Sequence, residues 1–451
     1  MEKKRSSFTG GIGFVLAAAG SAVGLGNLWR FPYLAAQYGG GIFILVYIIL
    51  ALTFGFALMT TEIAIGRKTK LSPTKAFGKI DKRFGFNGIL TFLVPTIILP
   101  YYCVIGGWVT KYVTVYFTGQ HVDAAGDSFF GNFISQPVAP LVFFSIYFGL
   151  TMLIVIMGVQ KGIEKFSKIL MPILIAIAVG ISIFVLTIPG SMDGLKYYFL
   201  PDFSKFSFMT VCAAMGQLFF SMSLAMGIMI TYGSYTKDEV SLVKSVNQIE
   251  IFDTVVALLA GLMIIPAVYI FSGEAGLESS GPGLMFQTLP KVFDQMPAGA
   301  IIGGAFFILV FFAALTSSVS VMESIVSMLM DKFGLSRIKS CIVVSIITLI
   351  LGIPSSLGNG IWSNIKILDM NFLSFFDYVS NYVIMPISAF ATCIMIGWFV
   401  GPKFVSDEVT KNGETFKREP ILNIVIKYIA PVLLLIILVV YSLVQFKFIS
   451  M

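Results

Sequence analysis

Charged residues and histidine are scarce in this chain. Only 12% of its 451 residues are charged, and its one histidine is His121. Soluble domains contain roughly 25% charged residues, so the composition excludes an ordinary soluble fold. A single histidine leaves no material for a histidine metal site or for Ser-His-Asp hydrolysis, which weighs against an enzyme.

Cysteine is also rare, and no secretory cleavage signal is present. Cys103, Cys212, Cys341 and Cys393 all lie inside apolar runs, without CxxC spacing. This pattern favours packing roles over disulfides or metal binding. The first apolar run is too long for a signal peptide and lacks a small-residue cleavage site, so we expect it to remain in the mature protein.

Apolar residues dominate what is present. The chain is 57% hydrophobic, with a mean hydropathy of +0.92. A membrane-spanning helix needs about 20 apolar residues. The sequence therefore predicts an all-α polytopic membrane protein with eleven transmembrane helices, at residues 12–37, 41–66, 87–118, 140–158, 166–188, 207–233, 243–272, 298–330, 339–357, 374–399 and 421–446.

Basic residues indicate the orientation. Most of the 30 lysines and arginines fall in the amino-terminal tail and in alternate loops, as in residues 67–83, 161–168 and 403–418. Short cytoplasmic loops are rich in lysine and arginine. We therefore expect a cytoplasmic amino terminus and, with an odd number of spans, an outside carboxyl terminus. This orientation in the bilayer accounts for the net positive charge of the chain, so binding to nucleic acid is not needed to explain it.

The first predicted span contains residues that do not suit a continuous membrane helix: Gly20, Gly24, Gly26, Asn27 and Arg30. Each glycine costs roughly 1 kcal/mol relative to alanine in a helix interior. Unwound backbone inside a membrane is tolerated only where it is buried in protein or lines a cavity. Free carbonyls there can hold a cation and free amides a carboxylate, so this stretch predicts a binding site.

The sixth predicted span repeats the interruption. Its middle, residues 217–227, carries serines and glycine where a helix would be expected to continue. Interrupted first and sixth spans are typical of transporters built from inverted repeats of five helices. We expect both helices to be unwound at mid-membrane, with repeats at 1–190 and 205–400, followed by a cytoplasmic loop and the eleventh helix at 401–451.

Polar residues in other spans add to this pattern. Asp253 lies deep in its span, where a carboxylate costs several kcal/mol unless it is paired or bound to an ion. Glu62 lies near the end of its span and fits either a functional role or a bond to backbone. The hydroxyls at 316–318 are compatible with interhelical bonding, but their clustering favours a cation site. One of Tyr101 and Tyr102 should meet a polar group.

Together these motifs resemble the neurotransmitter:sodium symporter family, in particular its bacterial eleven-helix amino-acid transporters with the leucine-transporter fold. The resemblance covers nearly the whole chain. It is carried by residues 20–32, 39–41, 62–67, 101–102, 219–227, 280–284 and 315–318.

The resemblance implies two sodium sites and one substrate site. The first sodium site would use Ala22, Asn27, Ser221 and Asp253 together with the substrate carboxylate. The second would use Gly20, Val23, Ala313, Thr316 and Ser317. The substrate carboxylate would meet Leu25, Gly26 and Tyr102, and the rest of the substrate would lie among Ala22, Ile98, Phe220, Ser221, Ser223, Met226, Ser317 and Val321.

The resemblance also implies gates. Arg30 and Asp377 would face each other above the site. Arg5 and Asp331 would do so below it, near Tyr235. Asp253 stands where chloride-dependent relatives carry asparagine, which implies that a fixed carboxylate replaces chloride.

The expected function is sodium-coupled import of hydrophobic or aromatic amino acids in a bacterial inner membrane, with two sodium ions and no chloride. Tyrosine, tryptophan, phenylalanine or a large aliphatic amino acid would fit, because the predicted walls carry no charge. Three other classes remain open from the residues: an amino-acid-gated ion channel, an intramembrane enzyme, and a sensor that binds an amino acid without transporting it.

Overall fold

The computed structural model describes residues 6–277 and 281–446. Within these ranges the chain is helical, apart from loops and two isolated bridges, Gly40 with Pro201 and Ile367 with Met370. The predicted all-α class is confirmed for this part of the chain. Arg5 lies outside the described residues, as do Ser280 of the motif at 280–284 and the carboxyl terminus from Lys447, to which an outside position was assigned.

Helices follow one another along both halves of the chain. The first half forms α1 (Gly11–Ala22), η1 (Gly26–Arg30), α2 (Phe31–Gln37), α3 (Gly41–Leu50), η2 (Ala51–Gly55), α4 (Phe56–Thr69), α5 (Pro73–Ile80), η3 (Lys82–Phe84), α6 (Asn87–Phe117), α7 (His121–Ala124), α8 (Phe129–Ser135), α9 (Ala139–Ile156), η4 (Val159–Glu164), α10 (Lys165–Leu186) and α11 (Ser191–Phe199). The second half forms η5 (Phe203–Lys205), α12 (Phe208–Ser221), α13 (Ile228–Tyr235), α14 (Leu242–Leu277), η6 (Leu284–Thr288), α15 (Leu289–Gln295), α16 (Gly299–Phe333), α17 (Arg337–Leu357), α18 (Phe372–Asp377), η7 (Tyr378–Ile384), α19 (Met385–Ile394), η8 (Met395–Val400), α20 (Lys403–Val409), α21 (Glu419–Ile424), η9 (Val425–Ile429) and α22 (Ala430–Gln445).

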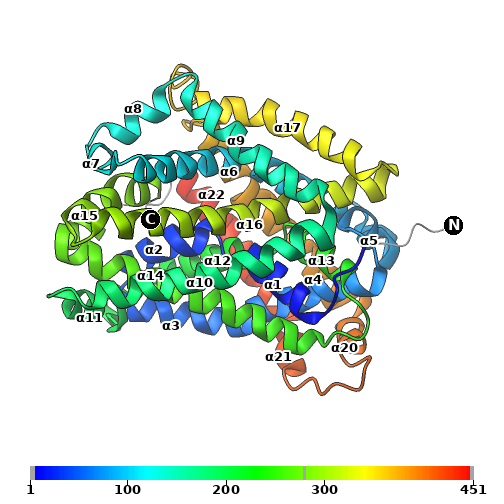
Figure 1. The fold of residues 1–451 in the computed structure, drawn as a ribbon. Coiled ribbons are helices and arrows are strands. Elements are labelled where there is room, and N and C mark those ends of the chain that lie inside the picture. The colour runs from blue at the N-terminus through cyan, green and yellow to red at the C-terminus, as the bar shows by residue number, and fades with distance from the viewer. Residues whose placement is uncertain (1–5, 278–280, 447–451) are drawn as a thin grey trace.

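Long apolar helices make this a multi-pass membrane protein. In the described part of the chain, 9 helices are long and apolar enough to cross a membrane, or up to 10 if the bent pair Gly11–Ala22 and Gly26–Gln37 is one span. The long helices run along the same direction in Figure 1. The predicted span at 207–233 is divided between α12, of 14 residues, and α13, of 8 residues.

Two of the predicted spans are interrupted in the structure. After α1, Val23 leaves the helical region with φ −74° and ψ 106°, and the helical halves of this span meet at 49°. Between α12 and α13, positive φ occurs at Ser223 (53°), Ala225 (57°) and Gly227 (72°). A left-handed backbone costs a non-glycine residue roughly 1–2 kcal/mol, so contacts from other helices must hold this segment.

Helix α13 packs backbone against backbone on α4. A Cβ atom added to Gly66 would overlap the Ile230 carbonyl, and one added to Gly233 would overlap the Ile63 carbonyl. Small residues permit such close approach between membrane helices. The two glycines therefore join the short α13 to a longer neighbouring helix.

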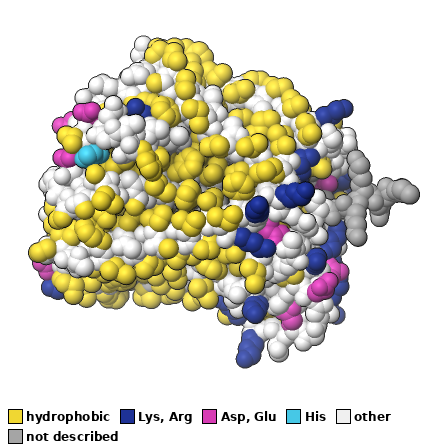
Figure 2. Space-filling model, viewed as in Figure 1, with side chains coloured by type: hydrophobic (Ala, Val, Ile, Leu, Met, Phe, Trp, Pro, Cys, Tyr) yellow, Lys and Arg dark blue, Asp and Glu magenta, His cyan; other side chains and the backbone are white. Residues whose placement is uncertain are grey.

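The surface divides into an apolar band and a basic end. Figure 2 shows hydrophobic side chains over the middle of the visible face, and most of its lysine and arginine side chains at the end where α5, α13 and α20 lie. Hydrocarbon tails suit the apolar band, while basic residues gather at one membrane face. This arrangement matches the predicted grouping of the basic loops.

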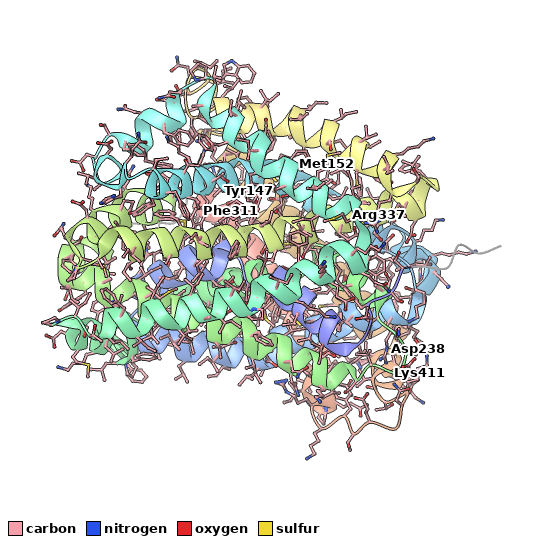
Figure 3. All side chains as sticks on the ribbon, viewed as in Figure 1. Tyr147, Met152, Asp238, Phe311, Arg337 and Lys411 are labelled. Carbon is pink, nitrogen blue, oxygen red and sulfur yellow. The ribbon has the colours of Figure 1, made fainter. Side chains whose placement is uncertain are left out.

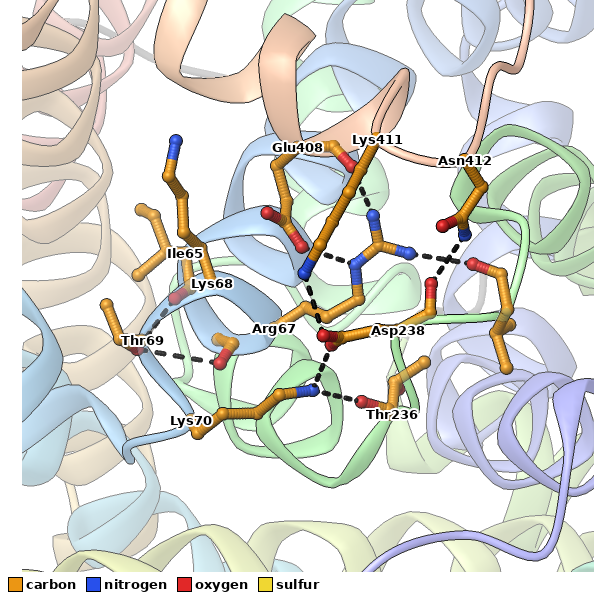
Figure 4. Close-up of polar contacts among 12 residues, drawn as sticks. Ile65, Arg67, Lys68, Thr69, Lys70, Thr236, Asp238, Glu408, Lys411 and Asn412 are labelled. Atoms are coloured by element: carbon orange, nitrogen blue, oxygen red, sulfur yellow. Dashed lines mark hydrogen bonds and ion pairs between the residues drawn. The ribbon is translucent and has the colours of Figure 1, made fainter.

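An almost fully buried ion pair joins α4 to α20 at the basic end (Figure 4). Arg67 Nε lies 2.6 Å from Glu408 Oε1, and the two side chains are 0% and 5% exposed. Arg67 also donates to the carbonyl of Val240 at 2.7 Å and to the carbonyl of Glu408. The guanidinium thus links α20 and the loop between α13 and α14 to the end of α4.

Asp238, in the loop between α13 and α14, lies between two lysines (Figures 3 and 4). It pairs with Lys411 at 2.7 Å and with Lys70 at 2.8 Å. Hydrogen bonds from Lys411 and Lys70 lower the pKa of Asp238 from 3.8 to about 2. Its contribution to stability is therefore complete above pH 3.8 and is lost as the pH falls through about 2. All three side chains are nearly half exposed, so this contribution is smaller than that of the buried pair.

We expect Glu408→Gln to lower the free energy of unfolding by about 3–5 kcal/mol, because Arg67 would remain buried without its charge partner. Thermal unfolding of the purified protein in detergent measures the loss. Lys411→Gln is the matched control, since it breaks a pair at the same end that is largely exposed. A loss in Glu408→Gln no larger than in the control would contradict the assignment.

Candidate functional site

A narrow cavity lies between the two broken spans, with α6 and α16 forming further walls. Its volume is about 20 Å³, which is room for roughly one water molecule, so the helices are closed around it. The lining consists of Ser21, Ala22, Gly24, Leu25, Gly26, Ile98, Tyr102, Phe220, Ser223, Met226, Ser317 and Val321. Every predicted substrate residue is among them except Ser221, and Ser21 and Gly24 are additions.

Hydrogen-bond donors gather at the break after α1. The Leu25 amide lies 3.5 Å from the hydroxyl oxygen of Tyr102, and the Gly24 amide donates to Asn27 Oδ1 at 3.1 Å. A Cβ atom on Gly24 would lie 2.6 Å from Ser317 Oγ and 3.1 Å from the Tyr102 hydroxyl, so the close approach of these segments requires glycine. Amide and hydroxyl donors at one end of a cavity suit a carboxylate.

Asp253, on α14, is the centre of a buried hydrogen-bond cluster. Its Oδ1 accepts from Asn27 Nδ2 at 2.8 Å and from Ser221 Oγ at 2.7 Å, while its Oδ2 accepts from the Tyr47 hydroxyl at 2.9 Å. All four side chains are buried. The structure thus brings together three of the four protein residues predicted for the first sodium site, and the fourth, Ala22, lines the cavity.

The residues predicted for the second sodium site lie on facing parts of α1, the break that follows it, and α16. Ser317 Oγ lies 3.4 Å from the Gly20 carbonyl oxygen and 3.2 Å from that of Val23. Thr316 Oγ1 lies 3.1 Å from the Ala313 carbonyl oxygen. Carbonyl and hydroxyl oxygens are the ligands that hard cations prefer, so this donor set fits an alkali cation.

Side chains hold the broken backbone in place. Glu62 Oε1, on α4, accepts from the Ala225 amide at 2.7 Å. Ser223 Oγ donates to the Ser21 carbonyl at 3.0 Å and accepts from Ser21 Oγ at 3.1 Å. Glu62 therefore bonds to backbone, one of the two roles that the sequence left open. These contacts satisfy backbone groups that lipid leaves unpaired.

The predicted upper gate residues have separate partners. Arg30 donates to the Tyr382 hydroxyl at 3.0 Å. Asp377 Oδ1 accepts from the Tyr101 hydroxyl at 3.1 Å and from Asn381 Nδ2 at 2.7 Å. No ion pair joins Arg30 to Asp377 in the described chain, so the predicted direct approach is absent from this conformation.

The predicted lower gate lies at the basic end. Tyr235 donates to Glu323 Oε1 at 2.6 Å, and Arg337 holds the same carboxylate at 2.5 and 2.9 Å. Arg337 stands at the start of α17 in Figure 3. Asp331 Oδ2 accepts a hydrogen bond from the backbone amide of Ser72, in the loop between α4 and α5, at 2.7 Å. Its predicted partner, Arg5, is outside the described residues.

Five polar residues of these networks were missed from the sequence: Tyr47, Glu323, Arg337, Asn381 and Tyr382. Tyr47 lies inside a predicted span, where the need of a buried tyrosine hydroxyl for a partner would have marked it. Glu323 is an ionisable residue in an apolar run, and this position marks it as a functional candidate in the same way as Asp253. Arg337 follows a loop, and its pairing with Glu323 becomes visible only once α16 and α17 are placed together.

These features define a class of protein: a multi-pass membrane transporter with its polar centre between two broken helices. The family model described as the Sodium:neurotransmitter symporter family matches residues 5–126 and 135–451. The chain belongs to this family, which is a family of transporters and not of enzymes, and it has the leucine-transporter fold.

Relatives and a solved structure agree with this assignment. An uncharacterised sodium-dependent transporter of Haemophilus influenzae is 32% identical, over 97% of this chain and 98% of its own. One from Bacillus subtilis is 32% identical, over 90% of each chain. The crystal structure of MhsT in complex with L-phenylalanine is similar with a TM-score of 0.88 and 36% identity, covering 96% of this chain and 99% of MhsT.

We expect Tyr47→Phe to destabilise the protein by about 1–3 kcal/mol, because Asp253 Oδ2 loses a hydrogen-bond donor. Tyr38→Phe is the matched control. Tyr38 and Tyr47 both stack on Phe43. The Tyr47 hydroxyl bonds to Asp253, whereas the Tyr38 hydroxyl bonds to no described residue. Thermal unfolding of both variants measures the difference. Equal melting temperatures for the two would show that the Tyr47 hydroxyl does not support Asp253.

Proposed function

We propose that this protein imports hydrophobic and aromatic amino acids by sodium-coupled alternating access. The observation that carries the proposal is one narrow cavity flanked by two buried oxygen clusters, one around Asp253 and one around Ser317. Family membership implies sodium coupling. The phenylalanine bound by MhsT supports an amino acid as substrate.

Two sodium ions are part of the proposal. Ala22, Asn27, Ser221 and Asp253 form the first site with the substrate carboxylate, and Gly20, Val23, Ala313, Thr316 and Ser317 form the second. The contacts among the residues of each set support this division. A cation beside Asp253 also offsets the cost of burying that carboxylate.

The substrate is proposed to lie with its carboxylate toward Leu25, Gly26 and Tyr102. Its side chain contacts walls without charge, which disfavour acidic and basic amino acids because an unpaired charge would be buried there. Met226 lines the cavity, and its flexible thioether adapts to rings and aliphatic chains alike. We therefore favour tyrosine, tryptophan, phenylalanine or a large aliphatic amino acid.

The proposed architecture has eleven spans, with α12 and α13 counted as one broken span. Residues 1–190 and 205–400 form the two inverted repeats, with the first helix of each unwound at mid-membrane, and 401–451 adds a loop and the last helix. The basic end faces the cytoplasm of a bacterium, which places the amino terminus inside and the carboxyl terminus outside.

We propose that the gate residues are connected through other polar side chains and not by direct ion pairs. Above the site, Arg30 and Asp377 are held by Tyr382, Tyr101 and Asn381. Below it, Tyr235 bonds to Glu323 while Asp331 and Arg5 complete the lower gate. Substrate entry requires these contacts to open, because the cavity is too small in the closed form.

We expect purified protein in proteoliposomes to take up labelled phenylalanine only with an inward sodium gradient, and to exchange it for internal phenylalanine. Exchange excludes a channel and a sensor that does not transport. Ser317→Ala should abolish the sodium response, because Ser317 is a proposed ligand. Ser318→Ala is the control, since Ser318 Oγ instead bonds to the side chains of Thr151 and Tyr147.

Two results would contradict the proposal. One is a wild-type sodium response in Ser317→Ala. The other concerns substrate class and comes from competition by all twenty amino acids against labelled phenylalanine. If glutamate or lysine competes best, the walls have been assigned to the wrong substrate.

Chloride gives a separate test. The fixed charge of Asp253 predicts that replacing chloride with gluconate leaves uptake by the unmodified protein unchanged. Asp253→Asn should lose most uptake and regain part of it with chloride, because a mobile anion then supplies the missing charge. Strong chloride dependence in the unmodified protein would disprove this role of Asp253.

A further inference from the structure

A groove of about 580 Å³ opens at the basic end of the helix bundle, away from the transport cavity. It lies where η8 ends and where α20, α21 and η9 come together. The groove shares no lining residue with the transport cavity. Nothing in the proposed transport cycle uses it, so its composition calls for a separate explanation.

Four charged side chains line the groove, two of each sign. Lys403 and Lys427 are basic, and Asp407 and Glu419 are acidic. None of the four forms an ion pair with another residue of the described chain. Neighbouring charges at the same end behave differently, as the pair between Arg67 and Glu408 shows. Both signs are therefore available to a ligand.

Two residues that line the groove carry polar atoms without partners. Ser406 and Asn423 line it, and Ser406 Oγ and Asn423 Oδ1 are buried and bond to no other described residue. Ser406 as a whole is 6% exposed. A buried polar atom without a partner costs roughly 1–3 kcal/mol, so such atoms in a native protein call for one. The hydroxyl of Ser406 can donate, whereas Asn423 Oδ1 can only accept.

Exposed aromatic side chains beside the groove are of the kind that gather at the depth of the lipid headgroups. Ile424 and Tyr428 form part of its wall and are 53% and 52% exposed, and Trp398 beside them is 57% exposed. Trp398 donates to the Lys427 carbonyl at 2.9 Å, and the Lys427 ammonium lies 5.3 Å from the Trp398 ring centre. Tryptophan and tyrosine gather at membrane interfaces, and basic pockets between helices bind lipid headgroups.

We propose that this groove binds the headgroup of a membrane phospholipid that carries both a phosphate and a primary ammonium, as phosphatidylethanolamine does. Lys403, Lys427 and the Ser406 hydroxyl hold the phosphate. Asp407, Glu419 and Asn423 Oδ1 accept the ammonium hydrogens. The acyl chains follow the apolar surface that Ile424 and Tyr428 begin.

The groove discriminates against the other common headgroups. A headgroup with negative charge alone would satisfy the lysines but would meet repulsion from Asp407 and Glu419. A choline headgroup has the right charges but no N–H group, so it leaves Asn423 Oδ1 unpaired. A primary ammonium supplies three donors and satisfies all three acceptors.

Native mass spectrometry of the full chain, released from nanodiscs with equal amounts of phosphatidylethanolamine, phosphatidylglycerol and phosphatidylcholine of the same acyl chains, tests the proposal. We expect about fivefold more retained phosphatidylethanolamine than phosphatidylglycerol, as two partly exposed ion pairs would give. A preference of similar size over phosphatidylcholine would come from the hydrogen bond to Asn423 Oδ1. Asp407→Asn with Glu419→Gln should shift the preference to phosphatidylglycerol. Lys403→Gln with Lys427→Gln should lower retention of all three.

Asp193→Asn and Lys339→Gln, which change exposed charges outside the groove, serve as controls and should keep the preference. Equal retention of the three lipids, a preference for phosphatidylglycerol in the unmodified protein, or an unchanged preference in Asp407→Asn with Glu419→Gln would each overturn the proposal. Soluble glycerophosphoethanolamine should not displace the lipid at equal concentration, because it lacks acyl chains. Displacement would overturn the membrane lipid as the source.

Discussion

Backbone hydrogen bonding inside an apolar medium is the constraint on which this structure depends. Breaking a helix in a membrane frees amides and carbonyls, and lipid offers them no partners. Here other helices supply them: Glu62 takes the Ala225 amide, Gln217 donates to the Gly26 carbonyl at 2.9 Å, and Ser317 donates to the Val23 carbonyl. Each break therefore depends on hydrogen bonds from these side chains, and the same side chains surround the cavity.

Asp253 connects the two broken spans to the proposed ion site. Its carboxylate touches the first broken span through Asn27, the second through Ser221, and α3 through Tyr47. Three donors reduce the cost of burying a charge but do not neutralise it. The sodium ion proposed beside it would neutralise it and so would strengthen the attachment between the two broken spans. In the proposed cycle, ion binding and helix position are coupled through this residue.

The sequence was sufficient for the all-α fold class and pointed to most of the residues that line the cavity, because glycines, hydroxyls and an intramembrane carboxylate are rare enough in apolar runs to stand out. It was insufficient for contacts that depend on the packing of distant helices. The family resemblance implied that Arg30 and Asp377 face each other, yet Tyr382 and Asn381 take their bonds. Glu323 and Arg337 were missed for the same reason. The proposed orientation and repeat boundaries still derive from the sequence.

The contacts also limit how the closed form can open. Helix α13 is joined to α4 by the close backbone approach at Gly66 and Gly233. It is joined to α16 by hydrogen bonds from Tyr235 to Glu323 and from Tyr232 to Ser320. The first contact is a steric fit between backbones, which separates only with loss of packing along both helices. The second consists of side-chain hydrogen bonds. A movement of α13 that widens the cavity toward the basic end therefore carries α4 with it and breaks the bonds to α16, where Glu323 keeps its ion pair with Arg337 of α17.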